Sequence, residues 1–302
     1  MLWAITCYFN PLGYQTRLRN YRIFRRHLTV PLITVELSYN PHFELRSPDA
    51  DVLVQIRGRD LLWQKERLLN VALRRVPEDC DSIAWLDCDV VFERTDWHEL
   101  ARRELQHFTL VQLFRIRCNL VRDAAKTGLA LSRTDSSSDS MGYKIAHHSA
   151  TADDLRIPGV STTGIAWAAR AEVLRSLGLY DACVIGSGDR ALACAALGKY
   201  SYAAEGLRMT ARQVQHYLHW ARPFSAAVRS GIGYIDGRVF HLWHGDLKHR
   251  RYVERFQGFQ KFEFDPFVDI VLDDQRIWQW NSDKPAMHEY VRRYFESRRE
   301  DG

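Results

Sequence analysis

No CxxC pair, no long apolar run and no long tract of one charge occur in this chain of 302 residues. A transmembrane helix needs about 20 consecutive apolar residues, so no membrane span is expected. The six cysteines lie mostly in apolar contexts, which is typical of reduced core thiols and not of a disulfide framework. The first residues lead directly into a strand pattern without a signal peptide. These absences predict a cytoplasmic protein.

The charge balance is mildly basic, with a formal net charge of +5 and a sequence pI of about 8.9. Such a balance is compatible with a phosphate-bearing ligand. The basic residues are spread along the chain, and the densest cluster covers only residues 248–251, so nucleic acid is not an expected partner. The nine Trp and thirteen Tyr fit a large core, with stacking on sugars or bases as the alternative.

Apolar runs alternate with helical patterns along the chain, which predicts an α/β fold with a mixed, largely parallel sheet flanked by helices. Strands are expected at 2–9, 32–37, 52–56, 109–116 and 232–244, and before the aspartates near residue 88; helices are expected at 14–28, 61–76, 171–178, 189–198 and 287–299. Residues 119–158 are polar and rich in serine. A segment this long with little regular structure is usually functional or disordered, and we take it as a candidate lid.

Two aspartates, Asp87 and Asp89, follow the apolar run that begins at Ile83, with one residue between them. Residues i and i+2 of a strand point to the same side, so both carboxylates are expected together at a strand end. Burying two close carboxylates is costly unless a cation bridges them. Oxygen ligands favour Mg²⁺ or Mn²⁺, which often carry phosphates. The pattern predicts a metal–diphosphate site, although aspartates that merely end a strand are common.

Two further positions allow a structural and a functional interpretation. Lys65 lies in a helical pattern, where it either belongs to a solvated basic face or reaches a phosphate or base. Asp189 follows the glycine-rich turn 186–188, where it either caps the next helix or acts as a general base. Gly164 lies in a preceding segment, and glycine lets backbone approach a ligand closely.

The late segment of the chain carries His241 and His244 just before Gly245. A single histidine in such a strand is more often a packed, hydrogen-bonded residue than a metal ligand. Two histidines within four residues shift the balance towards ligation, because imidazole is a common metal ligand. A turn at Gly245 would bring them together.

These segments, in this order, resemble those of a GT-A-type glycosyltransferase, and most closely the inverting β-1,4-galactosyltransferase group and its bacterial relatives. The resemblance rests on residues 63–71, 83–91, 186–189 and the segment of the two histidines, and it spans most of residues 2–252 as separated motifs. It implies a GT-A-like, Rossmann-like domain at residues 1–264, with a charged, helical C-terminal extension at residues 265–302.

Carried over by position, the resemblance implies direct binding of Mn²⁺, or Mg²⁺, by Asp89. Asp87 would contact the ribose or a metal-bound water and so also belong to the metal region. His241, His244 or both would complete the metal shell. Asp189 would be the catalytic base.

The resemblance also implies a nucleotide-sugar pocket, with Asn10 and Lys65 lining its uridine or phosphate part and Gly164 close to the donor. Two departures leave the acceptor open. Gly188 stands where the group has an acid before the base, and residues 183–186 stand where it has a Trp-Gly-Trp-Gly run.

The expected activity is therefore metal-dependent transfer of a sugar, with inversion, from a nucleotide-sugar to an acceptor hydroxyl. A UDP-linked donor and a glycan acceptor are favoured. Lys248 or Arg250 could stabilise the leaving diphosphate, although a solvated surface position is their ordinary role. One alternative is a metal-dependent hydrolase or nucleotidyltransferase, which would normally use a two-metal cluster. The other is a non-catalytic carbohydrate- or nucleic-acid-binding protein.

Overall fold

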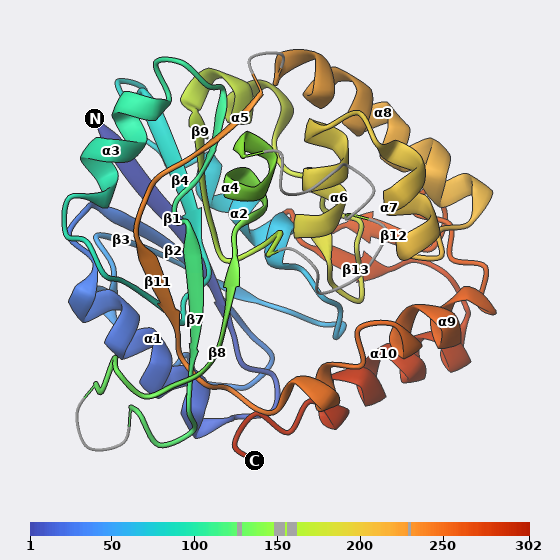
Figure 1. Cartoon of the computed structure of the whole chain (residues 1–302). Helices are drawn as coiled ribbons and strands as arrows, with labels where there is room; N and C mark the ends of the chain where they lie inside the picture. The colour runs from blue at the N-terminus through green and yellow to red at the C-terminus, as the bar shows by residue number, and fades with distance from the viewer. Residues whose placement is uncertain (126–128, 148–154, 156–161, 229–230) are drawn as a thin grey trace.

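Seven strands in the order β10-β6-β9-β4-β1-β2-β3 form the main sheet of the computed structural model, which describes the chain except residues 126–128, 148–154, 156–161 and 229–230 (Figure 1). The strands are β1 (Leu2–Phe9), β2 (Leu32–Ser38), β3 (Val52–Arg57), β4 (Ser82–Leu86), β6 (Leu110–Gln112), β9 (Ala166–Arg170) and β10 (Ile232–Tyr234). β9 runs antiparallel to β4 and β6, and the other neighbours are parallel. The expected mixed, largely parallel sheet is confirmed.

Helices cover both faces of this sheet because its strands are apolar on both sides (Figure 1). In β1, Ile5 and Phe9 pack into the core shared with α2, α5, α6 and α8, whereas Leu2 and Ala4 pack towards α1 and α3. The helices are α1 (Gln15–His27), α2 (Lys65–Leu73), α3 (Trp97–Glu104), α5 (Ala171–Leu177), α6 (Gly188–Ala196), α7 (Tyr200–Gly206) and α8 (Ala211–Ala227). A short 3₁₀ helix, η1 (Ser47–Asp49), precedes β3.

A second sheet joins two segments that are about 150 residues apart in sequence. Its order is β5 (Val90–Phe92), β11 (Arg238–His241), β7 (Ile116–Leu120) and β8 (Thr134–Asp139), and α4 (Met141–Ala146) follows β8. Antiparallel pairing places His241 opposite Val90, and the Leu242 amide donates to the Asp89 carbonyl at 2.8 Å. This pairing brings the aspartate turn after β4 beside the late histidines.

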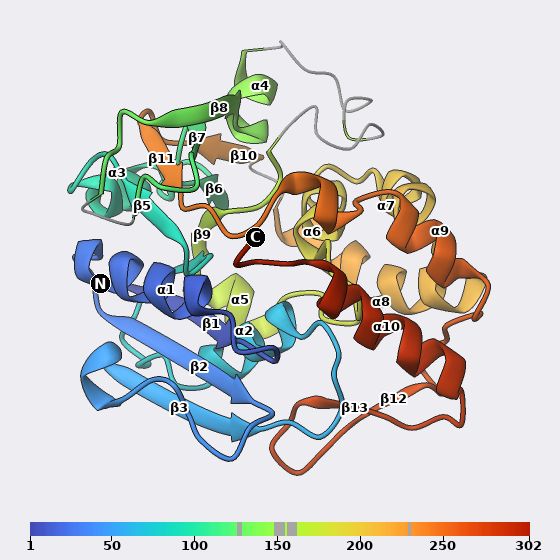
Figure 2. The same cartoon turned by 90° about the horizontal axis from the view of Figure 1, so that it is seen from below.

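The C-terminal part of the chain packs beside the carboxyl end of β1 and the start of α1 (Figure 2). It contains η3 (Leu247–Arg250), α9 (Glu254–Gln260), the hairpin β12 (Ile270–Leu272) and β13 (Trp278–Trp280), and α10 (Pro285–Ser297). Phe295 of α10 stacks on Trp63 with ring centroids 6.0 Å apart. Beyond α10, the Asp301 carboxylate accepts hydrogen bonds from the Gln15 and Thr16 amides and so caps α1.

Three expectations about the elements need correction. The strand expected at 109–116 is shorter, because β6 covers only Leu110–Gln112 and Ile116 already begins β7 in the second sheet. Residues 232–244 are not one strand: β10 and β11 belong to different sheets, and between them the chain turns at Gly237, whose φ is 142°. Residues 119–158 contain the strand β8 and the helix α4, so this segment has more regular structure than expected. Much of the candidate lid, residues 126–128, 148–154 and 156–158, lies outside the described residues.

The cysteines and the helices bear on two features of the sequence, its thiols and its lack of long apolar runs. All six cysteines are free thiols, and five of them are buried. Within the described ranges, no helix combines the length and the apolar character that a membrane crossing requires.

Candidate active site and metal centre

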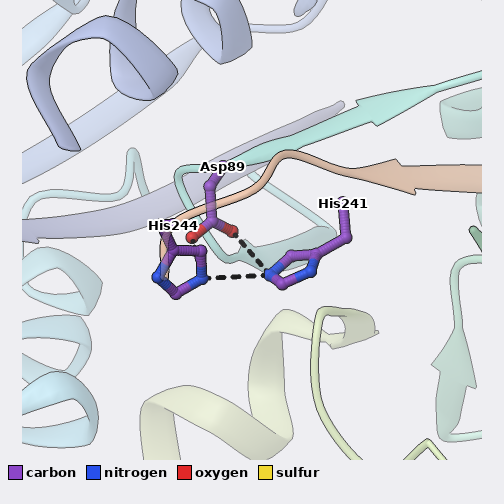
Figure 3. Close-up of side chains that lie close together, drawn as sticks. All are labelled: Asp89, His241 and His244. Atoms are coloured by element: carbon purple, nitrogen blue, oxygen red, sulfur yellow. Dashed lines mark hydrogen bonds and ion pairs between the residues drawn. The ribbon is translucent and has the colours of Figure 1, made fainter. Parts of the chain in front are cut away.

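Asp89, His241 and His244 point their polar atoms at one another (Figure 3), and one ligand atom from each lies within 4.8 Å of the others. His244 Nε2 lies 3.1 Å from Asp89 Oδ2 and 3.2 Å from His241 Nε2, and His241 Nε2 lies 3.7 Å from Asp89 Oδ1. All three residues are buried. Ligands at right angles around a divalent cation, with bonds of about 2.1 Å, lie about 3.0 Å apart. The cluster therefore has dimensions close to those of a metal site.

The chemistry of the three residues also fits a divalent cation. Burial and then the charge of Asp87 raise the pKa of Asp89 to about 7, so an isolated charge there is unfavourable. Asp89 Oδ1 is buried without a hydrogen-bond partner. Burial lowers the pKa of His241 well below its usual value and that of His244 to about 3, so both imidazoles are neutral. Two neutral imidazoles and an unpartnered carboxylate oxygen are the donor set that a cation satisfies.

A further side chain fixes the orientation of His241. Its Nδ1 donates to Asn119 Oδ1 at 3.1 Å, so Nε2 carries the lone pair that faces the cluster. In the structure, the Arg250 guanidinium donates a hydrogen bond to His244 Nε2 at 2.9 Å. This hydrogen bond must break before the Nε2 lone pair of His244 can bind a cation. The sequence analysis did not single out Asn119, which lies in β7 directly opposite His241.

A second cluster lies where α2 and α6 begin. Lys65 Nζ lies 2.5 Å from Asp87 Oδ1 and 2.9 Å from Asp189 Oδ2. Lys65 is buried, so its interpretation as part of a solvated basic face is wrong. Asp87 is held by this ammonium group and is absent from the Asp-His-His cluster, so the structure does not bring both carboxylates of the motif to one cation site. β4 ends at Leu86, and the two aspartates lie in the turn that follows it.

Asp189 lies in the first turn of α6, but its carboxylate does not act as the helix cap. The N-cap position is Ser187, with a φ of 70°, and the side-chain hydrogen bonds of Asp189 that the structure defines go to Lys65. Burial raises the pKa of Asp189, and the charge of Lys65 opposes this rise. Gly164 lies directly against this carboxylate, since a Cβ at residue 164 would come within 2.7 Å of Asp189 Oδ2. The glycine at 164 thus makes room for the candidate base.

Glu66 occupies the space beside Gly188. A Cβ at residue 188 would lie 2.2 Å from Glu66 Cδ, so only glycine fits there while Glu66 holds its position. Burial raises the pKa of Glu66 to about 8, and its Oε1 has no hydrogen-bond partner. The carboxyl group of Glu66, from α2, therefore occupies the space that a side chain at residue 188 would need. The sequence analysis did not single out Glu66.

One cavity of about 550 Å³ joins the two clusters. This volume lies within the range of small-molecule sites, about 300–1,000 Å³. Seven basic side chains and three carboxylates line it; the basic residues are Arg17, Lys65, Arg117, Arg190, Arg250, Arg255 and Arg298. The Nε–H groups of Arg117, Arg190, Arg250 and Arg255 are buried without an acceptor. The lining therefore favours an anionic ligand.

Some predicted residues lie elsewhere. Asn10 is not part of the cavity lining; its amide group bonds the Tyr14 backbone and Glu44, which holds the loop before α1. Lys248 is 73% exposed and pairs with Asp246, whereas Arg250 does line the cavity. The sequence analysis missed the other five lining arginines, because an isolated arginine in a helix or loop gives no signal about which space it faces.

No family model matches the sequence, and neither does any curated protein. Some solved structures are similar. The mannosyltransferase PcManGT from Pyrobaculum calidifontis, in complex with GDP-Man and Mn²⁺, is 17% identical over 76% of this chain and 68% of its own, with a TM-score of 0.37. TarS 1-349 of S. aureus, in complex with UDP-GlcNAc, is 9% identical over 98% of this chain and 72% of its own, with a TM-score of 0.40. A putative nucleotide-diphospho-sugar transferase from Desulfovibrio desulfuricans G20 is 11% identical over 99% of this chain and 96% of its own, with a TM-score of 0.34. All three scores lie below 0.5, so the function of this chain rests on its own site.

Proposed function

We propose that this protein is a metal-dependent glycosyltransferase that moves a sugar from a nucleotide-sugar to an acceptor hydroxyl, with inversion at the anomeric carbon. The observation that carries the proposal is one cavity that joins three metal-ligand candidates, an excess of basic side chains and a half-buried carboxylate suited to a general base. We take the donor to be UDP-linked and the acceptor to be a glycan, because the motifs resemble those of the galactosyltransferase group.

Two kinds of group in the cavity would bind the diphosphate of the donor. A divalent cation, when bound by Asp89, His241 and His244, supplies Lewis-acid stabilisation of the charge on the leaving diphosphate. The unpartnered guanidinium N–H groups of the lining donate to phosphate oxygens. Among them, Arg250 lies next to His244, so it can move from the imidazole to a phosphate without leaving the site.

Asp189 is the general base in this proposal. The acceptor oxygen forms a bond to the anomeric carbon while the bond from that carbon to the donor phosphate oxygen breaks. The hydroxyl proton passes to the Asp189 carboxylate, and the electron pair of the broken bond stays on the departing nucleoside diphosphate. Burial raises the pKa of Asp189, and the charge of Lys65 opposes this rise and so favours the ionised form that a base requires.

The two alternatives are less well supported by the geometry. A hydrolase or nucleotidyltransferase of the two-metal type needs further ligands for a second ion about 3.5–4 Å from the first. Among the residues that the structure describes, Asp89, His241 and His244 form the single metal-ligand cluster, and Asp87 is held by Lys65. A non-catalytic binding protein has no need for a half-buried carboxylate paired with a buried lysine beside the cavity.

The test is a transfer assay with UDP-sugars, Mn²⁺ and a panel of oligosaccharide acceptors. We expect product that carries the acceptor, and Asp189→Asn should lower kcat by about 10²–10⁴-fold with little change in donor affinity. Asp274→Asn, at an exposed position of the hairpin, is the matched control and should keep full activity. Full activity of Asp189→Asn would place the base elsewhere. Release of free sugar or nucleotide without acceptor-linked product would favour a hydrolase.

A further inference from the structure

Glu300 is a carboxylate buried behind the metal-ligand cluster, with an exposed fraction of 1%. It accepts hydrogen bonds from Arg17 on α1 and from Arg298 just after α10. These two guanidinium groups balance the charge of the carboxylate. They do not explain why the carboxylate lies directly behind the metal-ligand cluster.

The nearest group of the metal cluster is His244. Its Nε2 faces Asp89 and His241, whereas its Nδ1, on the other side of the ring, is buried without a hydrogen-bond partner. Glu300 Oε1 lies 3.8 Å from this Nδ1. His244 and both arginine partners of Glu300 line the cavity but Glu300 does not, so the carboxylate lies on the far side of the imidazole from the ligand space.

We propose that Glu300 is the positioning residue of His244: it accepts the Nδ1–H and so directs the Nε2 lone pair towards the bound divalent cation. This inference rests on the metal site of the proposed function. Each histidine would then have its own acceptor for the Nδ1–H, because Asn119 already accepts that of His241. A ligating histidine usually donates its other N–H to a carboxylate or carbonyl group. A shift of about 1 Å closes the present gap to a hydrogen bond.

The segment 298–302 is built to hold Glu300 in this place. Asp301 caps α1, and the Arg122 side chain donates to the Asp301 carbonyl at 2.5 Å. The backbone also packs closely on the turn after His244: a Cβ at Gly245 would come within 3.0 Å of the Arg298 and Arg299 carbonyl oxygens. Arg298 and Glu300, which follow α10, are therefore buried beside the metal-ligand cluster and are not part of a solvated tail.

The experiment measures Mn²⁺ affinity by electron paramagnetic resonance or calorimetry, without nucleotide, on the full chain. Glu300→Gln keeps the size of the side chain but removes its charge, and we expect a loss of affinity of about 10–100-fold. Glu296→Gln, at an exposed position of α10 where the carboxylate pairs with Arg292, is the matched control and should bind Mn²⁺ like the wild type. Thermal unfolding and circular dichroism establish that each variant is folded.

A double-mutant cycle separates positioning from a general structural effect. If Glu300 acts through His244, Glu300→Gln should cause no further loss of Mn²⁺ affinity in the His244→Ala variant. An equal loss in both backgrounds would overturn the inference, as would wild-type Mn²⁺ affinity in Glu300→Gln. Tighter nucleotide binding with unchanged Mn²⁺ affinity would also overturn it, because Glu300 would then compete with phosphate. If the wild type itself binds no Mn²⁺, the metal site of the proposed function fails first.

Discussion

Replacing Lys65 by methionine removes the positive charge that separates Asp87 from Asp189. Lys65 contacts both carboxylates, and the side chains of Lys65, Asp87 and Asp189 are only 11%, 25% and 23% exposed. Breaking a buried ion pair by removing one partner costs about 3–5 kcal/mol. Because the two carboxylates retain some solvent, we expect the lower end, a loss of about 3 kcal/mol in the free energy of unfolding at pH 7.5.

The loss should depend on pH with a defined sign. The folded-state pKa of Lys65 is raised well above its usual value, so its contribution is present at all pH values below about 10.4. Burial raises the folded-state pKa of Asp189, and removing Lys65 raises it further. A folded state with the higher pKa binds more protons, so stability falls as pH rises through that range. The deficit of Lys65→Met should therefore be largest at pH 8 and smaller at pH 5.

Urea unfolding of the wild type and Lys65→Met between pH 5 and pH 8 measures this deficit. Lys248→Met is the matched control, because that side chain is 73% exposed and its loss should change stability by less than about 0.5 kcal/mol. Adding Asp189→Asn to Lys65→Met should restore part of the stability. A deficit below about 0.5 kcal/mol, or one that is constant from pH 5 to pH 8, would refute the reasoning.

Two further changes test neighbouring contacts. Gly188→Ala should destabilise the fold because its Cβ would lie 2.2 Å from Glu66 Cδ, and Glu66→Ala should relieve the conflict. Denaturation of the wild type, the two single variants and the double variant should show a coupling energy of about 1–3 kcal/mol, whereas additive effects would contradict the packing. Arg250→Ala should raise Mn²⁺ affinity about fivefold in the absence of nucleotide, because a like charge about 4 Å away costs about 1 kcal/mol even in water. The variant also frees His244 Nε2 from the hydrogen bond of the guanidinium. Calorimetry that finds weaker Mn²⁺ binding would refute this.

The sequence was most informative where burial alone determines the pattern. The strands β1, β2 and β3 are mostly apolar, and their observed bounds differ from the predicted ones by no more than one residue. The predicted helix at 14–28 is observed at Gln15–His27. Asp89, His241 and His244 were predicted from ligand chemistry, and the structure brings them together.

The remaining features depend on contacts that local patterns do not encode. Residues 232–244 look like one apolar strand, but the two halves pair with different partners, β6 and β7, which no periodicity distinguishes. The partner of Asp87 is a lysine that shares no local pattern with it. Glu300 lies in a charged segment that composition alone assigns to solvent, and its burial depends on Arg17, 283 residues away.

The most direct test of the proposed function is whether nucleotide binding depends on Mn²⁺ through Asp89. Calorimetric titration of UDP and UDP-sugars into the wild type, with and without Mn²⁺, should show binding at least about tenfold tighter with the metal, a difference of about 1.4 kcal/mol. In Asp89→Asn this dependence on Mn²⁺ should disappear, while Asp274→Asn should behave like the wild type. Equal affinity with and without Mn²⁺ in the wild type, or an unchanged Mn²⁺ dependence in Asp89→Asn, would contradict the proposed function.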